Sequence, residues 1–367
     1  MFTIDLNVNP KDRWKEVTRR YCHLWPLLMA KMENQEGTEH LKSVLEGHLT
    51  RLGRREDWMD EMRGIAEHSN GSITFDSLVN LNLSYELTEE CGCTSIVSRR
   101  SDGTIYLART LDWMWTDILR SLTIQVRFVR GKKELFTAST IAGYVGVLTG
   151  VRKRLSVSIN YRQDVGDIGS TDDAWPIGFL VRHVMTSSQD CDYQMAKRIF
   201  SRENLWSPCY VIMAGGHGEG CIITRGSTFV EKLENLEESS SSSTRSRRPK
   251  VLIQTNIDNE KVMNKTYPDF MRSKDRYKDV KEFLETTSNG LESDMWDVLM
   301  LKSVWDHDTV FGTVMKPDTN EMETRYNNNN SNISSIKEMK KWILCDLRVG
   351  VVFLALMVMV LLKLLYL

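Results

Sequence analysis

The chain has 367 residues, enough for one large domain or two smaller ones with a substantial buried core. Its formal net charge is −1, which argues against a nucleic-acid partner, because domains that bind nucleic acid usually carry a clear basic excess. The seven cysteines include no CxxC pair with metal-site spacing. A structural zinc site is therefore not expected, and no other cofactor is predicted.

Residues 10–68 are expected to form two or three amphipathic helices. Apolar residues recur at helical spacing from Trp14 to Leu28 and again from Leu41 to Leu52, with Gly53 as a candidate break. His48 lies on the second apolar stripe. We interpret it as a packed core histidine rather than a ligand.

The pattern changes to strands at Cys93. Two runs rich in β-forming residues, 93–98 and 104–110, are separated by a polar turn that contains Gly103, which predicts a β-hairpin. Strand-like runs continue to residue 161 and return between residues 208 and 257. Helical patterns at 175–185 and 193–200 separate these two blocks. The alternation predicts an α+β fold with two sheets and helical outer layers, although composition alone does not select it over other α+β folds.

Two segments have the composition of loops. Residues 237–249 are rich in serine and are expected to form a loop inserted between two strands. Residues 317–342 contain an asparagine run and are interpreted as a linker that follows the globular body.

The C-terminal residues 343–367 are predicted to be a membrane anchor. Val349 to Leu367 is a 19-residue run with one charge, Lys363, and at 1.5 Å per residue a helix of this length spans roughly 28 Å, close to a hydrocarbon core. The alternative is an extra helix packed on the globular body. The first 14 residues have no basic stretch followed by an apolar run, so no secretory signal peptide is expected there.

Cys93 is the candidate nucleophile, because it heads an apolar strand directly after Gly92. A lone cysteine is more often a small buried hydrophobic residue, and a conventional Cys-His enzyme needs a histidine partner. His217, in a glycine-rich loop, is the only loop histidine that could be this partner, but the glycines around it indicate a turn rather than a catalytic site. If the chain is cut before Cys93, the new α-amine, with a reference pKa of about 7.7–8.0, can serve as the base.

The segment from Cys93 to Trp113 resembles the acid ceramidase and N-acylethanolamine acid amidase family. The family pattern is C-T-S-I-V, a hairpin turn and then G-R-N-x-D; this chain has CTSIV at 93–97 and ARTLD at 108–112. Ala108 and Thr110 therefore replace the first glycine and the asparagine of the pattern. Further similar segments lie at 5–17, 141–162, 208–225 and 254–259, in the family's order.

The resemblance implies a four-layer αββα N-terminal-nucleophile hydrolase fold. It further implies an N-terminal helical piece, residues 1–92, that is released from a catalytic domain, residues 93–316, by autoproteolysis of the Gly92–Cys93 bond. The two pieces are expected to stay associated as a heterodimer. The residues that it assigns to the site are the nucleophile Cys93, its neighbours Arg109 and Asp112, the oxyanion donor Asn256, and Arg276 and Asn160.

The activity implied by the resemblance is hydrolysis of the amide bond of a fatty-acyl lipid. Ceramide, N-acylethanolamines and lipid binding without cleavage remain open, although the intact candidate residues argue against the last. The family also implies a lysosomal or other endomembrane location. The N-terminal pattern and the C-terminal apolar run would instead fit a cytosol-facing tail-anchored protein, an incomplete reading frame or a lipid-anchor signal, and the sequence leaves these alternatives open.

Overall fold

Two β-sheets packed face to face form the centre of the molecule in a computed structural model that describes residues 1–32, 56–87, 91–162, 174–187, 192–236, 251–258, 270–286 and 294–326. All of these residues belong to one unit, Met1–Asn327, and residues 328–367 form another. The apolar run 349–367, His48 and the serine-rich segment lie outside the described residues. No helix within the described ranges is long and apolar enough to cross a membrane.

The large sheet has eight strands in the order β1-β4-β5-β6-β7-β8-β9-β10, and the small sheet has five in the order β11-β2-β3-β12-β13. Strand pairing is antiparallel except between β1 and β4. The large sheet contains β1 (Phe2–Asp5), β4 (Thr123–Arg130), β5 (Lys133–Ile141), β6 (Thr149–Arg152), β7 (Leu155–Tyr161), β8 (Cys209–Gly215), β9 (Gly220–Arg225) and β10 (Val230–Asn235). The small sheet contains β2 (Cys91–Arg99), β3 (Ile105–Trp113), β11 (Val251–Gln254), β12 (Thr309–Lys316) and β13 (Glu321–Tyr326).

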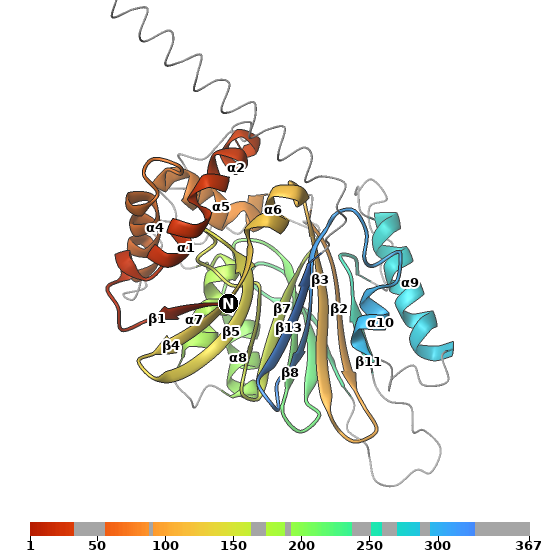
Figure 1. The fold of residues 1–367 in the computed structure, drawn as a ribbon. Helices are drawn as coiled ribbons and strands as arrows, with labels where there is room; N and C mark the ends of the chain where they lie inside the picture. Colours follow the sequence, from red (N-terminus) through yellow and green to blue (C-terminus); the bar gives the residue numbers. More distant parts are fainter. Residues whose placement is uncertain are drawn as a thin grey trace, which may run out of the picture. The chain divides into compact units, whose positions relative to one another are not determined.

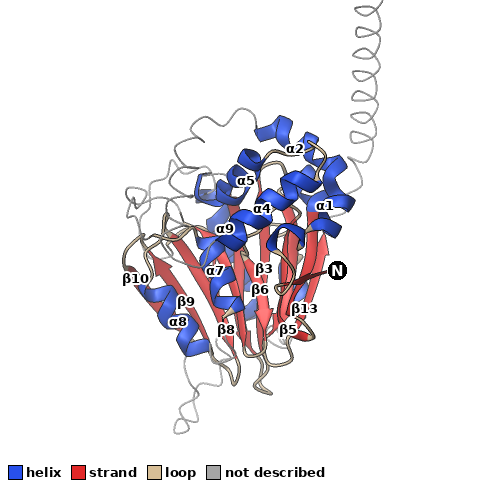
Figure 2. Ribbon diagram, turned by 90° about the vertical axis from the view of Figure 1, so that its left-hand side faces the viewer, coloured by secondary structure: helices blue, strands red, loops and turns tan. Residues whose placement is uncertain are grey.

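Helices cover the outer face of each sheet, as Figures 1 and 2 show. Helices α7 and α8 pack on the large sheet, α9 and α10 pack on the small sheet, and β2 and β3 contact β7 and β8 between the sheets. This is the four-layer αββα arrangement that the resemblance implied. The helices are α1 (Lys15–Tyr21), α2 (Trp25–Met32), α4 (Glu56–His68), α5 (Phe75–Leu87), α6 (Thr116–Leu122), α7 (Ile177–Thr186), α8 (Tyr193–Arg202), α9 (Phe270–Thr286) and α10 (Met295–Leu299), with short 3-10 turns at Pro10–Asp12 and Cys22–Leu24.

The predicted hairpin is confirmed and is formed by β2 and β3. Gly103 adopts a positive φ of 89° in the turn, which glycine does at little cost. The register places Cys93 opposite Leu111 and Gly92 opposite Asp112. Since side chains alternate across a strand, this register decides which face of the hairpin each candidate residue occupies.

The N-terminal piece is not purely helical. Strand β1 pairs in parallel with β4 at the edge of the large sheet, and its Ile4 side chain is buried. A four-residue strand is too short to show a recognisable alternation, so it could not be predicted from the local pattern. Residues 1–92 therefore contribute to the sheet as well as to the helical layer.

The segment interpreted as a linker begins later than expected. Residues 321–326 form strand β13, which pairs with β12 from Phe311 to Lys316. Its half-exposed, polar sequence resembles a loop, but backbone hydrogen bonds to β12 hold it in the sheet. The part of the linker after residue 326 lies outside the described residues.

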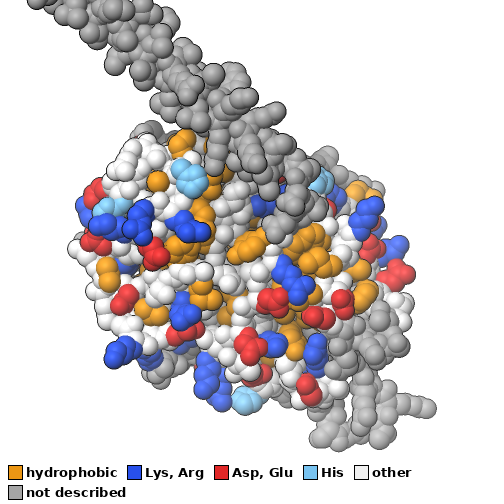
Figure 3. Space-filling view, in the orientation of Figure 1, with side chains coloured by type: hydrophobic (Ala, Val, Ile, Leu, Met, Phe, Trp, Pro, Cys, Tyr) orange, Lys and Arg blue, Asp and Glu red, His pale blue; other side chains and the backbone are white. Residues whose placement is uncertain are grey.

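Surface charges do not separate into large fields of one sign. On the face that Figure 3 shows, acidic and basic side chains are interspersed. This distribution agrees with the net charge of −1.

Candidate active site

Cys93 lies inside strand β2, and its side chain is fully buried between the two sheets. In this uncut chain its nitrogen is a backbone amide, which donates to Asn256 Oδ1 over 2.7 Å. Its Sγ atom lies 3.9 Å from the carbonyl oxygen of Ile159, on β7 of the large sheet. The thiol therefore faces the large sheet, and no solvent reaches it while the chain is continuous.

Arg109 is the charged group that contacts the thiol. Its Nη2 atom lies 3.0 Å from Cys93 Sγ and donates to Ile159 O over 3.1 Å, while Nη1 donates to Thr149 Oγ1 over 2.5 Å. The guanidinium is fully buried and has no carboxylate partner among the described residues. A buried cation without a counter-charge favours negative charge beside it, so this group can stabilise a thiolate on Cys93.

Asp112 and Arg276 lie on the opposite face of the hairpin, toward α9. Arg276 Nη1 donates to Asp112 Oδ2 over 2.7 Å, and Thr309 Oγ1 donates to Asp112 Oδ1 over 2.8 Å. A Cβ atom added to Gly92 would lie 2.9 Å from both Arg276 Nη1 and Asp112 Oδ2. A larger residue at the predicted cleavage site would thus displace the ends of this buried ion pair, which favours glycine there.

Asn256 connects the two faces. Its Oδ1 accepts from the Cys93 amide and from Arg276 Nη2, over 2.7 and 2.9 Å, and its Nδ2 donates to Tyr161 O over 2.9 Å. Because two donors converge on Oδ1, the orientation of the side-chain amide follows from its neighbours. One Nδ2 hydrogen is used by Tyr161, which leaves the second for another acceptor.

Asn160 contacts the structure around the site and not the thiol. It accepts from Ser95 Oγ over 2.7 Å and donates through Nδ2 to Gln254 O over 2.9 Å. These bonds join β7 to β2 and to the end of β11, the strand that Asn256 follows. Its place in the structure fits a positioning residue.

Burial raises the pKa of the Cys93 thiol above its ordinary value, and Arg109 opposes this effect. Asp112 adds to the rise, and Arg276 lowers the pKa. The thiol is therefore protonated at neutral pH in the uncut chain, so catalysis needs a base that removes its proton.

Three polar residues of the site had not been predicted. Thr149, at the start of β6, reaches Arg109, and Thr309, at the start of β12, reaches Asp112; no local pattern marks either residue. Ser273 Oγ accepts from Arg276 Nη2 over 2.8 Å, and its spacing of three residues on helix α9 is a signal that could have identified it. His217 is exposed in the turn between β8 and β9, with a φ of 59°, as its turn composition suggested.

One group of described side chains has the geometry of a metal site, Asp306, His307 and Asp308. Arg272 pairs with both carboxylates, over 2.6 and 2.8 Å. These ion pairs account for the acidic cluster, and it lies in the loop before β12.

Comparison with known proteins identifies the family. The chain is 30% identical to acid ceramidase from Pan troglodytes and to acid ceramidase from Homo sapiens, in each case over 355 residues that cover 88% of this chain and 85% of the relative. This chain belongs to the acid ceramidase family. It is also 29% identical to the N-acylethanolamine-hydrolyzing acid amidase of Caenorhabditis elegans, over 86% of this chain and 88% of the relative.

No family model matches the chain. Among solved structures, a Caenorhabditis elegans N-acylethanolamine-hydrolyzing acid amidase ortholog is 30% identical, covering 62% of this chain and 93% of that one, with a TM-score of 0.49.

Proposed function

We propose that this chain hydrolyses the amide bond of a fatty-acyl lipid, with ceramide as the first candidate substrate and a sphingoid base and free fatty acid as products. The supporting observation is the convergence of Cys93, Arg109 and Asn256 beside Gly92 in a member of the acid ceramidase family. N-acylethanolamines are the second candidate, because the relative from Caenorhabditis elegans that bears that name is nearly as similar.

Maturation is the first step of the proposed mechanism. The Cys93 thiol adds to the carbonyl carbon of Gly92, the carbon–nitrogen bond breaks, and the thiol proton passes to the departing Cys93 nitrogen. Water then hydrolyses the resulting thioester and leaves a Gly92 carboxylate and a free Cys93 thiol and α-amine. Full burial of the thiol in the continuous chain supports this order, since a lipid could not reach Sγ before the cut.

Catalysis then uses the new α-amine as the base. It removes the thiol proton, Sγ adds to the substrate amide carbon, and the oxyanion accepts a hydrogen bond from Asn256 Nδ2. The amine product leaves with a proton from the α-ammonium group, and water hydrolyses the acyl-thioester. Asn256 Oδ1, which now accepts from the Cys93 nitrogen, would hold the α-amine in the same place.

The two pieces, 1–92 and 93–367, are proposed to remain associated as a heterodimer. Arg182 of α7 binds Glu61 of α4 through Nη1 and Nη2, over 2.6 and 2.7 Å, and both side chains are buried. Strand β1 adds backbone hydrogen bonds to β4. These contacts join residues from both sides of the proposed cut without a covalent bond.

A catalytically weak, lipid-binding homologue is the remaining alternative. The presence of Cys93, Arg109, Asp112 and Asn256 in mutual contact, directly or through Arg276, argues against it.

We further propose that residues 343–367 anchor the enzyme to a membrane, where its lipid substrates are concentrated. Burying about 15 large apolar side chains at roughly 1.5–3 kcal/mol each far exceeds the cost of one lysine that reaches the interface. The family points to an acidic lysosomal or other endomembrane compartment, and a cytosol-facing orientation is the alternative. Truncation at Ile343 should release a stable, active enzyme from membranes. Unfolding of the truncated catalytic body would contradict the anchor.

The decisive experiment for function is mass spectrometry of purified protein incubated at about pH 5 with ceramide and with an N-acylethanolamine. We expect a cut before Cys93 and release of fatty acid from at least one lipid, with the relative rates deciding between the two substrates. Cys93→Ala should remain a single chain and release no fatty acid. Turnover by a wild-type enzyme that is still uncut would exclude the α-amine as base.

A further inference from the structure

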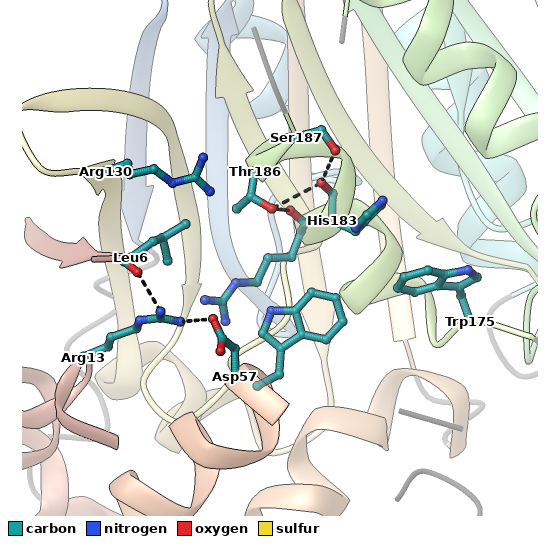
Figure 4. Close-up of a pocket in the computed structure, with 10 residues that line it drawn as sticks. Leu6, Arg13, Asp57, Arg130, Trp175, His183, Thr186 and Ser187 are labelled. Carbon is teal, nitrogen blue, oxygen red and sulfur yellow. Dashed lines mark hydrogen bonds and ion pairs between the residues drawn. The ribbon is translucent and has the colours of Figure 1, made fainter. Parts of the chain in front are cut away.

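A second site is suggested by a cavity of about 440 Å³ on the helical side of the large sheet, shown in Figure 4. A volume of this order is within the range of small-molecule sites. Its lining comes from the residue after β1, the turn before α1, helix α4, the end of β4, and helix α7 with the residues that flank it. The residues that define its chemistry are Arg13, Asp57, Trp58, Arg130, Trp175 and Arg182.

The cavity does not belong to the Cys93 site. The Arg182 guanidinium lies 5.0 Å from the ring centre of Phe128 on β4. Gln125, three residues earlier on the same strand and so on its other face, donates to Thr324 of the small sheet over 2.9 Å. Arg182 thus lies on the outer face of the large sheet, whereas Cys93 Sγ lies between the sheets.

Positive charge exceeds negative charge around the cavity. Arg13 donates to Asp57 and to Glu61, over 3.0 and 2.8 Å, and Arg182 binds the same Glu61. Two carboxylates therefore balance these two guanidiniums. Arg130 is additional: it is exposed, and within the described ranges its side chain has no hydrogen-bond or ion-pair partner.

The cavity also has an apolar wall. Trp58 and Trp175, which are 8% and 6% exposed, meet edge to face with ring centres 6.2 Å apart. Trp58 also stacks on Phe179 at 5.1 Å, and Trp175 lies beside the His183 ring at 5.2 Å, so each indole presents only part of its surface to the cavity. The exposed part of an indole binds apolar groups, and arginine binds carboxylate, sulfonate or phosphate. The tryptophans and the arginine together favour a ligand that has an apolar body and an acid group.

We propose that this cavity is a binding site for an organic anion with a flat apolar body, held by Arg130 through its acid group and by the two tryptophans through its body. Arg13, Asp57 and Trp58 precede the proposed cut, whereas Arg130, Trp175 and Arg182 follow it. An occupant therefore contacts both pieces of the mature protein and strengthens their association. Binding itself is independent of amide hydrolysis; only this strengthening depends on the proposed cleavage.

Calorimetric titration of the full chain with naphthalene-1-sulfonate tests the site. We expect saturable binding of one molecule per chain, and weakening of about tenfold in Arg130→Gln, the loss of roughly one charge-assisted hydrogen bond. Lys132→Gln removes the same charge from an exposed position in the same hairpin, outside the cavity, and should change the affinity less than twofold. Neutral 1-naphthalenemethanol and inorganic phosphate should each bind more weakly than the sulfonate, because each lacks one of the two parts.

Absence of saturable binding to the wild-type chain would overturn the proposal. So would equal weakening by Arg130→Gln and Lys132→Gln, which would indicate general surface attraction. Phosphate that binds as tightly as the sulfonate would refute the role of the tryptophans. Cys93→Ala should bind the sulfonate like the wild type, so failure of the catalytic mechanism and failure of this site are distinguishable.

Discussion

The two faces of the β2–β3 hairpin each hold a buried arginine, but the partners differ. On the outer face, Arg276 is paired with Asp112 next to Gly92. On the inner face, Arg109 contacts the Cys93 thiol, a threonine hydroxyl and a backbone carbonyl. The first arginine has its counter-charge within the fold, whereas the second is left to stabilise negative charge that arises only during the reaction. The difference separates a positioning pair from a group that acts on the reacting sulfur.

The largest effect is expected from breaking the outer pair. Arg276→Met leaves the Asp112 carboxylate buried without its cation and should lower the free energy of unfolding by about 3–5 kcal/mol. Chemical denaturation in a Cys93→Ala background measures this without interference from chain cleavage. The double variant Arg276→Met/Asp112→Asn should recover part of the loss. A double variant no more stable than Arg276→Met would show that the pair is not the source of the effect.

Substitution of Arg109 on the inner face should change reaction rates and not only the stability of the fold. Arg109→Met removes the cation beside Sγ and should slow both chain cleavage and lipid hydrolysis by about 10²–10³, the usual effect of removing one preorganised charge-stabilising donor. Arg109→Lys keeps the charge and should retain more activity. Rates of cleavage followed by electrophoresis provide the measurement. If the methionine and lysine variants are equally impaired, shape rather than charge is what Arg109 supplies.

Asn256 joins the two faces, and its substitution tests whether its side chain stabilises the oxyanion or only binds substrate. Asn256→Ala should reduce kcat by about 10²–10³ with little change in KM, because the oxyanion exists only in the tetrahedral intermediate. Steady-state kinetics of already cut protein give both constants. A change confined to KM would mean that Asn256 binds substrate instead of stabilising the oxyanion.

A smaller, pH-dependent effect is expected at Glu86, a buried carboxyl that, unlike Asp112, has an oxygen without a hydrogen-bond partner in the described part of the chain. Burial raises its pKa from 4.5 to about 8. The folded state therefore keeps a proton that the unfolded chain loses, so stability falls as the pH rises from about 4.5 to about 8.

Glu86→Gln removes this titration and should flatten the dependence by up to a few kcal/mol, with the two proteins similar at pH 5 and the variant more stable at pH 8. Its side-chain oxygen can still accept from the Ile177 amide, as Glu86 Oε1 does over 2.8 Å. Unfolding temperatures across this range give the comparison. If the unfolding temperatures of the wild type and of Glu86→Gln changed with pH in parallel, the pH dependence would come from a group other than Glu86.

Local signals accounted for much of the fold. The hairpin around Gly103 was predicted from its turn and flanking β-formers, and helix α8 begins at Tyr193, directly after the N-cap residue Asp192, whose side chain accepts from the Met195 amide. The edge strands β1 and β13 were missed, because a short edge strand is stable only through the neighbour it pairs with. That neighbour is distant in sequence for β1.

The sequence by itself determined the candidate nucleophile, the glycine before it and the hairpin that carries Arg109 and Asp112, because a turn and the β-formers that flank it are local signals. The sequence-based interpretation placed both Arg109 and Asp112 beside Cys93, whereas the register of the folded hairpin puts Cys93 and Arg109 on one face and Asp112 on the other. Only the tertiary structure decided that Asn256 and Arg276 meet at Gly92, and that Asp112 has Arg276 as its partner rather than the cysteine. These contacts span up to 164 residues of chain. They depend on how α9 packs on the small sheet, and no local pattern specifies that packing.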